Sequence, residues 1–372
     1  MGSRLMSALT KLLGTTASAA AVSLLVLPAP AEALDRVRWQ VPMAFASTLT
    51  ALGDTMPWVA DQLRLVSDGA IDLQVAEPGA VIPALSVFEN VSTGAIDAGY
   101  SWMGYEIGQV PASALFGATP FGLESVEYLA WMYFHGGRDL LNETFAPFDV
   151  IPIPCGTISP EAGGWFREPV DEVADLQGIR FRAAGVGGEI FSEFGASVTM
   201  LPGGELYQAL ETGVLDGTEF SLPTVDEQLG FYQVAPYYYL PGWHQPSTNQ
   251  FLYINLGVWE GLSEQTQGLI DMACMAGNAY AIARAEALQG EVLARFEERG
   301  VTLGTFDDET LLAFWEATET VMERRSAADE MFGRVHDSMR EFQREHAVWK
   351  DLGYLPRDWM RENVFNDEEI AE

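Results

Sequence analysis

The sequence predicts an α/β protein of two lobes followed by long C-terminal helices. The chain has 372 residues. A single hydrophobic core rarely supports a chain of this length, so two lobes are expected. Apolar residues alternate from Val37 to Val41 and from Ile71 to Val75, as in strands, and residues 49–66 between them have a helical repeat. This strand–helix–strand order is typical of a mostly parallel sheet covered by helices. Pro57 inside the helical segment predicts a kink or a late helix start.

The first 33 residues have the pattern of a cleaved signal peptide and are excluded from this fold. Arg4 and Lys11 precede an apolar run, and Ala31-Glu32-Ala33 forms an A-x-A cleavage pattern. The alternative is an N-terminal membrane anchor, but the run is short and interrupted, and no later stretch has the length of a membrane span. The pattern therefore predicts a soluble mature protein outside the cytoplasm, in the periplasm.

An internal echo predicts that the two lobes are built alike. Residues 93–101 read Thr-Gly-Ala-Ile-Asp-Ala-Gly-Tyr-Ser, and residues 212–221 read Thr-Gly-Val-Leu-Asp-Gly-Thr-Glu-Phe-Ser. In each, a glycine ends a helical segment and a short strand follows. Ligands of open α/β sheets bind outside the carboxyl ends of the strands. We therefore expect Tyr100 and Ser101 of lobe 1, and Glu219 and Phe220 of lobe 2, around a shared cleft.

Composition limits the possible partners. The net charge is −33, with only 20 Lys and Arg, so the field around the protein repels nucleic acid and anionic membrane surfaces. An anionic ligand needs locally concentrated positive charge, which makes each inward-pointing arginine a candidate. Cys155 and Cys274 lie 119 residues apart in apolar surroundings, and either a disulfide or two buried thiols fits them.

The part of the chain after residue 258 is predicted to be helical. Ser263 can cap a helix that runs to Glu298 and ends at Gly300, and Asp307 or Asp308 can cap the next one. From Ala328 to Trp349, apolar residues and His346 recur at alternating steps of four and three, a heptad-like seam. This seam fits either packing on the protein's own body or contact with a second subunit.

Catalytic motifs of the P-loop, H-E-x-x-H and G-x-S-x-G types are absent from the sequence, and its four histidines are scattered. Glu161 and Glu219 lie in Gly-rich or apolar surroundings, and Arg182 lies near the end of a strand-like run. Arg180 and Arg182 share one face of that strand, but Arg182 is nearer to the Gly-rich turn and is therefore favoured for the cleft. A guanidinium binds a carboxylate through two parallel hydrogen bonds. Carboxylate oxygens near an anion site suit a hard cation such as Na⁺ or Ca²⁺.

Four segments share the pattern of one known family. They are Gly-Gly-Trp-Phe at 163–166, Leu-Gln-Gly-Ile-Arg-Phe-Arg at 176–182, the segment Leu-Pro-Gly-Gly-Glu-Leu-Tyr-Gln-Ala-Leu-Glu-Thr-Gly at 201–213, and 226–243, which ends Tyr-Tyr-Tyr-Leu-Pro-Gly-Trp. Nearly the whole mature chain resembles the extracytoplasmic solute-binding proteins of TRAP transporters (the DctP-type family), and within them the subclass that binds 2-oxo and 2-hydroxy monocarboxylates, such as pyruvate and lactate.

The resemblance implies a two-lobed periplasmic-binding-protein fold with hinge strands. The boundaries expected are 1–33 for the signal peptide, 34–157 for lobe 1 with part of about 245–300 returning to it, 158–244 for lobe 2, and 301–372 for the C-terminal helices. Members of the subclass form dimers through an exchanged C-terminal helix, which favours the second subunit as the partner of the seam. The family's other partners are the membrane subunits of the transporter.

The resemblance also assigns site residues. Arg182 would bind the ligand carboxylate, and a metal ion would bridge ligand and protein. The metal ligands expected are Glu161, the Glu219 carboxylate, the backbone carbonyl of Phe220 and Gln245. Relatives carry Gln at position 161 and Glu at position 245, so the charge is placed differently here and both Na⁺ and Ca²⁺ stay open, with Ca²⁺ favoured if both carboxylates coordinate.

Two further residues, Tyr100 and Trp102, are expected at the ligand from their place at the lobe 1 strand end, although their effect on specificity is open.

The sequence also allows a second function. Glu161 and Glu219 could be the paired carboxylates of a secreted glycoside hydrolase, with tryptophans stacking on sugar rings. That hypothesis leaves the Gly-rich family segments without a role, so the sequence favours a binding protein that is not an enzyme.

Overall fold

The computed structural model describes residues 34–364, so the predicted signal peptide lies outside the described residues. The strands are β1 (Val37–Pro42), β2 (Ile71–Ala76), β3 (Ala98–Trp102), β4 (Val150–Ile158), β5 (Gly164–Phe166), β6 (Arg180–Arg182), β7 (Ser197–Thr199), β8 (Gly217–Thr218), β9 (Tyr237–Leu240), β10 (Thr248–Asn255) and β11 (Thr302–Thr305). The α-helices are α1 (Thr55–Val66), α2 (Val87–Ser92), α3 (Ser113–Gly117), α4 (Ser125–Phe134), α5 (Gly137–Phe145), α6 (Gly185–Glu193), α7 (Gly203–Glu211), α8 (Pro223–Leu229), α9 (Leu256–Glu260), α10 (Glu264–Glu286), α11 (Gln289–Glu298), α12 (Asp308–Ala328), α13 (Glu330–Gly353) and α14 (Trp359–Asn363).

The N-terminal strand–helix–strand unit forms as predicted. β1 and β2 pair in parallel, with Val37 opposite Ile71, and α1 connects them. The helix begins late, at Thr55, so that Pro57 is its third residue. Proline is tolerated there because the first turn of a helix has no internal acceptor for its N–H groups.

A three-stranded sheet in the order β3-β10-β4 joins distant parts of the chain. β10 is antiparallel to both neighbours, and it comes from the segment predicted to return to lobe 1. The lobe boundaries themselves stay a prediction.

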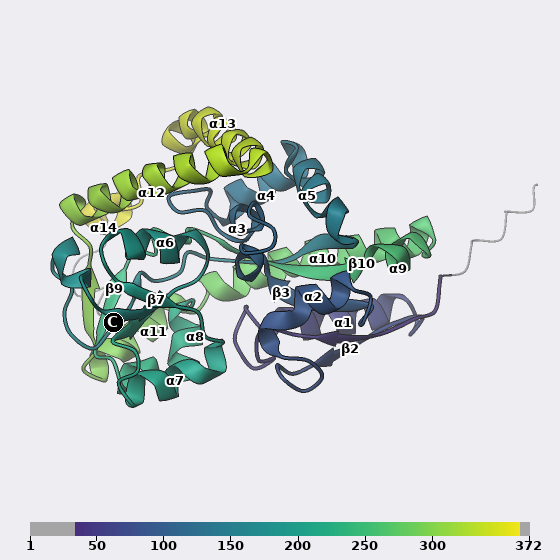
Figure 1. The fold of residues 1–372 in the computed structure, drawn as a ribbon, viewed down its shortest axis with the longest axis horizontal. Coiled ribbons are helices and arrows are strands. Elements are labelled where there is room, and N and C mark those ends of the chain that lie inside the picture. The colour runs from purple at the N-terminus through teal and green to yellow at the C-terminus, as the bar shows by residue number, and fades with distance from the viewer. Residues whose placement is uncertain (1–33, 365–372) are drawn as a thin grey trace, which may run out of the picture. The chain divides into compact units, whose positions relative to one another are not determined.

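A second, six-stranded sheet has the order β11-β9-β5-β8-β6-β7 and lies beside α6, α7, α8 and α11 in Figure 1. Within it β6 and β8 are parallel, with Arg182 opposite Thr218. Their carboxyl ends therefore meet at one edge, and this brings Arg182 beside Glu219, the residue that follows β8.

The internal echo corresponds to two equivalent helix ends. Gly94 follows α2 and Gly213 follows α7, both at φ 69°, a left-handed conformation that glycine adopts without strain. In both, the glycine N–H donates to the carbonyl three residues back, at 3.0 Å. The strands that follow, β3 and β8, belong to different sheets.

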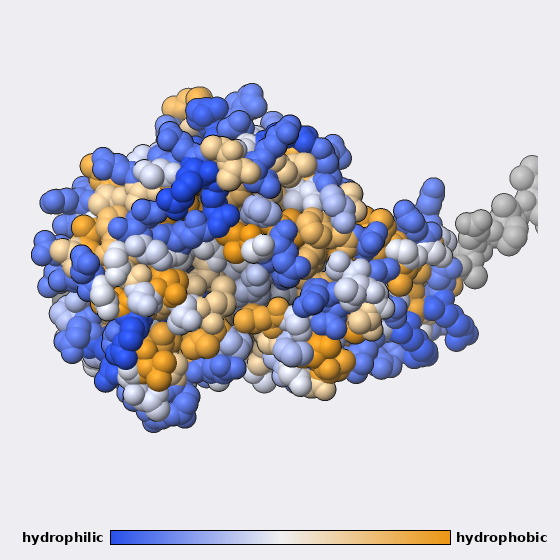
Figure 2. Space-filling model, in the orientation of Figure 1, coloured by the Kyte–Doolittle hydropathy of each residue, from blue (hydrophilic) through white to orange (hydrophobic). Residues whose placement is uncertain are grey.

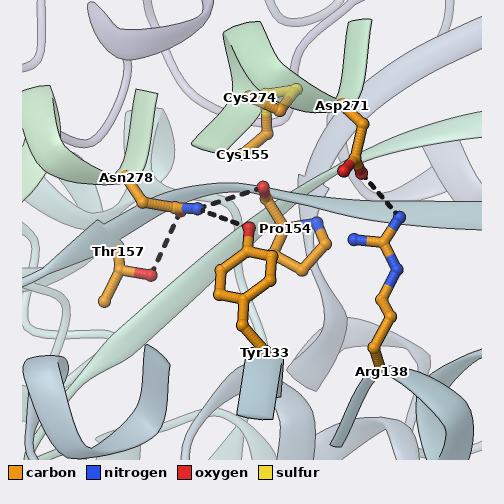
Figure 3. The surroundings of a disulfide bond; sticks show 8 residues. All are labelled: Tyr133, Arg138, Pro154, Cys155, Thr157, Asp271, Cys274 and Asn278. Carbon is orange, nitrogen blue, oxygen red and sulfur yellow. Dashed lines mark hydrogen bonds and ion pairs between the residues drawn. A yellow bond between two sulfur atoms is a disulfide. The ribbon is translucent and has the colours of Figure 1, made fainter. Parts of the chain in front are cut away.

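Cys155 and Cys274 form a disulfide that joins β4 to α10. The pairing decides between the two alternatives that the sequence left open. Asn278, one turn further along α10, donates through Nδ2 to the carbonyl of Pro154 at 3.2 Å and to the hydroxyl of Tyr133 at 3.1 Å (Figure 3). The disulfide and the buried amide together hold α10 against this strand.

The helix predicted from Ser263 to Glu298 is two helices, α10 and α11, so the prediction of one helix is wrong. Ser263 caps α10 as expected, its Oγ accepting from the Thr266 N–H. The break falls at Ala287–Leu288, where the side-chain amide of Gln289 donates to the carbonyl of Ala285 at 2.6 Å. The alanines continue up to Ala287 and favour a helix as far as the break, and Gly290 lies just beyond it.

The last two long helices, α12 and α13, are capped by Asp307 and Asp329. α12 packs on α6, and α13 packs on α4 and α5 (Figure 1). Four residues of the predicted seam are buried by these contacts: Phe332, Val335, Met339 and Phe342. Further along, Lys350 Nζ pairs with Glu124 at 3.0 Å and Glu127 at 3.1 Å, whereas Trp349 is 58 % exposed. The first half of the seam therefore packs on the chain's own body.

The described residues contain no helix with the length and hydropathy of a membrane span. Hydrophilic residues cover most of the face that Figure 2 shows, with hydrophobic areas scattered between them. This agrees with the net charge of −33.

Candidate functional site

A small cavity collects residues from both halves of the described chain. Its lining is Phe45, Leu52, Trp102, Tyr105, Glu161, Arg182, Ala184, Glu219, Phe220, Gln245 and Thr248. Six of the seven predicted site residues are in this set, and they come from segments up to 143 residues apart in sequence, Trp102 to Gln245. The exception is Tyr100.

Arg182 is the buried cation of the cavity. Its side chain is 2 % exposed, whereas every other arginine that forms an ion pair in the described chain is at least 22 % exposed. Arg180, two residues earlier, pairs with Asp216 at the surface. β6 ends at Arg182, so the preference for the residue nearer the strand end agrees with its position.

The Arg182 guanidinium is held by three oxygen acceptors. Nη1 donates to the Glu219 carboxylate at 2.9 Å and to the Glu219 carbonyl at 2.8 Å, and Nε donates to the carbonyl of Leu201 at 3.1 Å. The Phe220 ring lies 5.2 Å from its central carbon, a distance at which an aromatic face attracts a cation. The guanidinium is therefore fixed in orientation.

Glu219 is a buried carboxylate that stays ionised. Burial raises its pKa, but the charge of Arg182, together with His244 and the Ala184 N–H, outweighs burial and leaves the pKa below its ordinary value. The Ala184 N–H donates to Oε1 at 2.8 Å. The other carboxylate oxygen, Oε2, is buried and has no hydrogen-bond donor.

Glu161 is a second buried carboxylate, but its pKa is shifted in the opposite direction from that of Glu219. Gln245 Nε2 donates to its Oε2 at 2.5 Å and Thr248 Oγ1 to its Oε1 at 2.8 Å. Burial nevertheless raises its pKa well above the ordinary value, and repulsion from Glu219 raises it further. Two carboxylates and one guanidinium leave the ionised cavity with an excess negative charge, which favours a cation.

These opposite shifts predict opposite effects of two matched substitutions on cation-free protein. The raised pKa of Glu161 contributes stability below the ordinary pKa of about 4.3, and this contribution is lost as the pH rises through the folded-state value. Between pH 5 and pH 8, the unfolding free energy of Glu161→Gln should therefore fall less than that of wild-type protein. The lowered pKa of Glu219 contributes stability above its ordinary pKa, so Glu219→Gln should destabilise the protein at pH 8, by about 3–5 kcal/mol for one partner of a buried ion pair.

Chemical denaturation in EDTA at the two pH values measures both effects. A Glu161→Gln variant less stable than wild type at pH 8 would contradict the electrostatic account of the site.

Tyr100 and Ser101 are not among the residues that line the cavity, contrary to the sequence expectation. β3 continues to Trp102, so the residue at the strand end is Trp102, and Tyr100 lies inside the sheet opposite Leu252. Tyr100 is fully buried, and its hydroxyl lies where a side chain at Gly156 would clash with it. It is part of the hydrophobic core that packs on this sheet.

Sequence reasoning missed three polar residues of the site. Thr248 is the first residue of β10, and Tyr105 lies in the 3-10 helix Met103–Glu106 that follows Trp102. Burial raises the pKa of Tyr105 to about 12, against the opposing charge of Arg182. His244 Nε2 is 3.5 Å from Glu219 Oε2, and its side chain is 1 % exposed. His244 directly precedes Gln245, a predicted site residue, and this position in the sequence could have indicated that it lies at the site.

The polar atoms at this site suit a cation. One ligand atom each of Glu161, Glu219 and His244 lies within 4.8 Å of the others. Glu219 Oε2 and Gln245 Oε1 are buried without hydrogen-bond partners, which is costly unless another group binds them. Oxygen donors of this kind are the ligands that hard cations prefer.

Comparison with known proteins identifies the family. The model of the DctP family, described as bacterial extracellular solute-binding protein, family 7, matches residues 45–329. The chain belongs to this family. A relative from Nostoc sp. (strain PCC 7120), a monocarboxylate 2-oxoacid-binding periplasmic protein, is 31 % identical over 323 residues, which cover 87 % of this chain and 88 % of the relative.

Two solved structures of similar proteins extend the comparison. A TRAP transporter solute-binding protein from Bordetella bronchiseptica RB50, a mixed-occupancy dimer with calcium and picolinate, is 27 % identical with a TM-score of 0.83, covering 86 % of this chain and 95 % of that one. A TRAP periplasmic solute-binding protein from Pseudoalteromonas atlantica T6c, with sodium and pyruvate, is 26 % identical with a TM-score of 0.83, covering 89 % and 100 %. The predicted family and the two-lobed α/β fold with long C-terminal helices are confirmed.

Proposed function

We propose that this DctP-family protein captures a small 2-oxo or 2-hydroxy monocarboxylate outside the cytoplasm for the membrane subunits of a TRAP transporter. The observation that carries the proposal is one buried arginine and two buried carboxylates in the lining of a single cavity. The similarity to a 2-oxoacid-binding protein and to structures with pyruvate or picolinate supports it.

Arg182 supplies the contact for the ligand carboxylate. The guanidinium is buried and oriented, and a charge-assisted bond to a carboxylate is stronger in a dry cavity than in water. Glu219 occupies Nη1 in this structure, so the ligand carboxylate would share or replace that contact.

A bridging Na⁺ or Ca²⁺ would be held by Glu161, Glu219, the Phe220 carbonyl and Gln245. When bound, the cation neutralises the carboxylates and offers a positive centre to the oxygens of the ligand. The buried, unpartnered Glu219 Oε2 and Gln245 Oε1 support this ligand set. Two ionised carboxylates favour Ca²⁺ over Na⁺.

A thermal-shift screen tests the function. Pyruvate, lactate and larger monocarboxylates are added to protein with calcium, with sodium alone, and with EDTA, because a ligand that binds only the native state raises its melting temperature. We expect stabilisation by 2-oxo or 2-hydroxy acids and its loss in EDTA. A shift equal with acetate, which lacks the second oxygen, would contradict the proposal.

His244 positions Glu219 in this proposal. Its ring nitrogens have no hydrogen-bond partner, and a small movement of the carboxylate would bring Oε2 within hydrogen-bond distance of Nε2, now 3.5 Å away. Partners of metal-binding side chains typically contribute 10- to 100-fold to metal affinity. We expect His244→Phe to lower calcium affinity about tenfold or more, and His244→Gln, which keeps a neutral donor, to retain more of it.

Calorimetric titration of calcium in the presence of pyruvate measures the difference. Equal calcium affinity in the Phe variant and wild type would remove His244 from the site.

The C-terminal helices form a homodimer in this proposal. Trp349, Leu352 and Leu355 at and beyond the end of α13 are between 58 % and 82 % exposed, and a second copy would cover them. Sedimentation should give the mass of two chains, and Leu352→Glu should shift it towards one.

The glycoside hydrolase hypothesis remains the alternative for Glu161 and Glu219. Membership of a solute-binding family speaks against it. Turnover of chromogenic glycosides that disappears in Glu219→Gln would support it instead.

A further inference from the structure

Trp102 forms a fixed wall of the cavity. It is the last residue of β3 and is 5 % exposed. Its indole meets the ring of Tyr105 edge to face, with centroids 5.1 Å apart. Both rings line the cavity that contains Arg182.

Three glycines leave the space that the indole occupies. A Cβ at Gly104 would lie 1.9 Å from Trp102 Cη2, and one at Gly117 would lie 2.8 Å from Nε1. Both distances are shorter than any side chain accepts. A Cβ at Gly185, the first residue of α6, would lie 3.1 Å from Cη2. The indole therefore packs directly on backbone on more than one side, and the wall has little freedom to retreat from a ligand.

Most of the remaining apolar lining is also bulky. It consists of Phe45, Leu52 and Phe220, with Ala184 as the one small residue, and Phe220 itself packs on Gly203, where a Cβ would lie 2.3 Å from the ring. The cavity contains about 260 Å³ of empty space, including its opening to solvent.

From this packing we infer that Trp102 is a specificity-determining residue that limits the ligand to acids with a short, unbranched tail. The inference rests on the proposed function, because it assumes that the carboxylate of the ligand lies at Arg182. With that end fixed, the tail of the ligand extends among the rings. A branched or aromatic tail would have to displace an indole that packs on glycine backbone.

The test compares a series of 2-oxo acids on wild-type protein with calcium. Affinities are measured by calorimetry for pyruvate, 2-oxobutanoate, 4-methyl-2-oxopentanoate and phenylpyruvate. Because one misfitting methylene in a pocket is worth about 10- to 200-fold, we expect pyruvate or 2-oxobutanoate to bind at least about tenfold more tightly than the two larger acids.

Variants then assign the effect to Trp102. In Trp102→Ala the preference for pyruvate over 4-methyl-2-oxopentanoate should fall at least about tenfold, and Trp102→Phe should give a smaller change while keeping an aromatic core. Trp131→Phe is the matched control. Trp131 is a buried tryptophan whose Nε1 donates to Ser338 at 3.0 Å, and it does not line the cavity, so its replacement should leave the preference unchanged.

Three outcomes would contradict different parts of the inference. Equal wild-type affinity for small and large acids overturns the size limit while leaving the proposed function intact. An unchanged preference in folded Trp102→Phe and Trp102→Ala overturns the assignment to Trp102. Failure of all four acids to bind wild-type protein overturns the proposed function and the inference with it.

Discussion

Arg182→Ala should lower the affinity for pyruvate by at least about 30-fold. Truncating one partner of a buried, hydrogen-bonded charge pair costs about 2–5 kcal/mol, and each 1.4 kcal/mol is a factor of about ten in affinity. The variant also leaves Glu219 buried without its cation, so the cavity would repel an anion more strongly. Calorimetric titration of pyruvate with calcium present measures the loss.

Arg180→Ala is the control that the chain itself provides. Arg180 lies on the same strand, but its side chain is 51 % exposed and pairs with Asp216 at the surface. Surface ion pairs contribute little to stability, and we expect unchanged pyruvate affinity. Arg182→Lys keeps the charge and loses the planar fork, so an intermediate loss is expected. Equal affinities in the Arg182 and Arg180 variants would move the carboxylate site elsewhere.

Removing the disulfide should produce a large loss of stability. Cys155 and Cys274 are 119 residues apart, and the cross-link limits the unfolded chain more strongly the longer the loop it closes. We expect the double variant Cys155→Ala/Cys274→Ala to lose about 2–5 kcal/mol of unfolding free energy, measured by denaturation in urea. Both side chains are fully buried, so alanine avoids adding a polar group to the core.

Reducing agent separates the cross-link from the lost side-chain volume. Dithiothreitol in denaturant should lower the stability of wild-type protein and leave the double variant unchanged. Asn278→Ala should be a milder change, because it removes the amide that bonds Pro154 and Tyr133 while the covalent link stays. Wild-type and double-variant proteins of equal stability would contradict the entropic account of the cross-link.

Local pattern was sufficient to predict much of the fold. Alternation and helical repeat located β1, α1 and β2, because one face of each element is buried. The repeated glycine at 94 and 213 marked two helix ends because only a left-handed residue fits there. The break between α10 and α11 was harder to predict, since the alanines before it favour a helix and the nearby Gly290 lies inside α11 and not at a helix end.

The candidate site was predictable where a residue follows a strand end. Arg182 is the last residue of β6, and Glu219 directly follows β8. These two strands are parallel neighbours, so their order in the sheet brings the two residues together. Tyr105 and Thr248 reach the cavity from a 3-10 turn and a strand start, and His244 reaches Glu219 from a loop. Their side-chain directions depend on the packing of distant segments, and no periodicity encodes that. The prediction for Tyr100 failed for a similar reason. β3 continues to Trp102, so Trp102 and not Tyr100 is the residue at the strand end that lines the cavity.

The contact between Lys350 and α4 has a practical consequence. Lys350 is the one lysine that follows the first 33 residues of this sequence, and its ammonium lies between Glu124 and Glu127 with the side chain 41 % exposed. If the chain is cleaved after residue 33, as the sequence predicts, an amine-reactive dye would therefore attach at only two places, this ammonium and the α-amino terminus. At a pH where the terminal amine is blocked first, a single fluorophore could be placed on α13, and its emission would report whether that helix stays docked on its own chain.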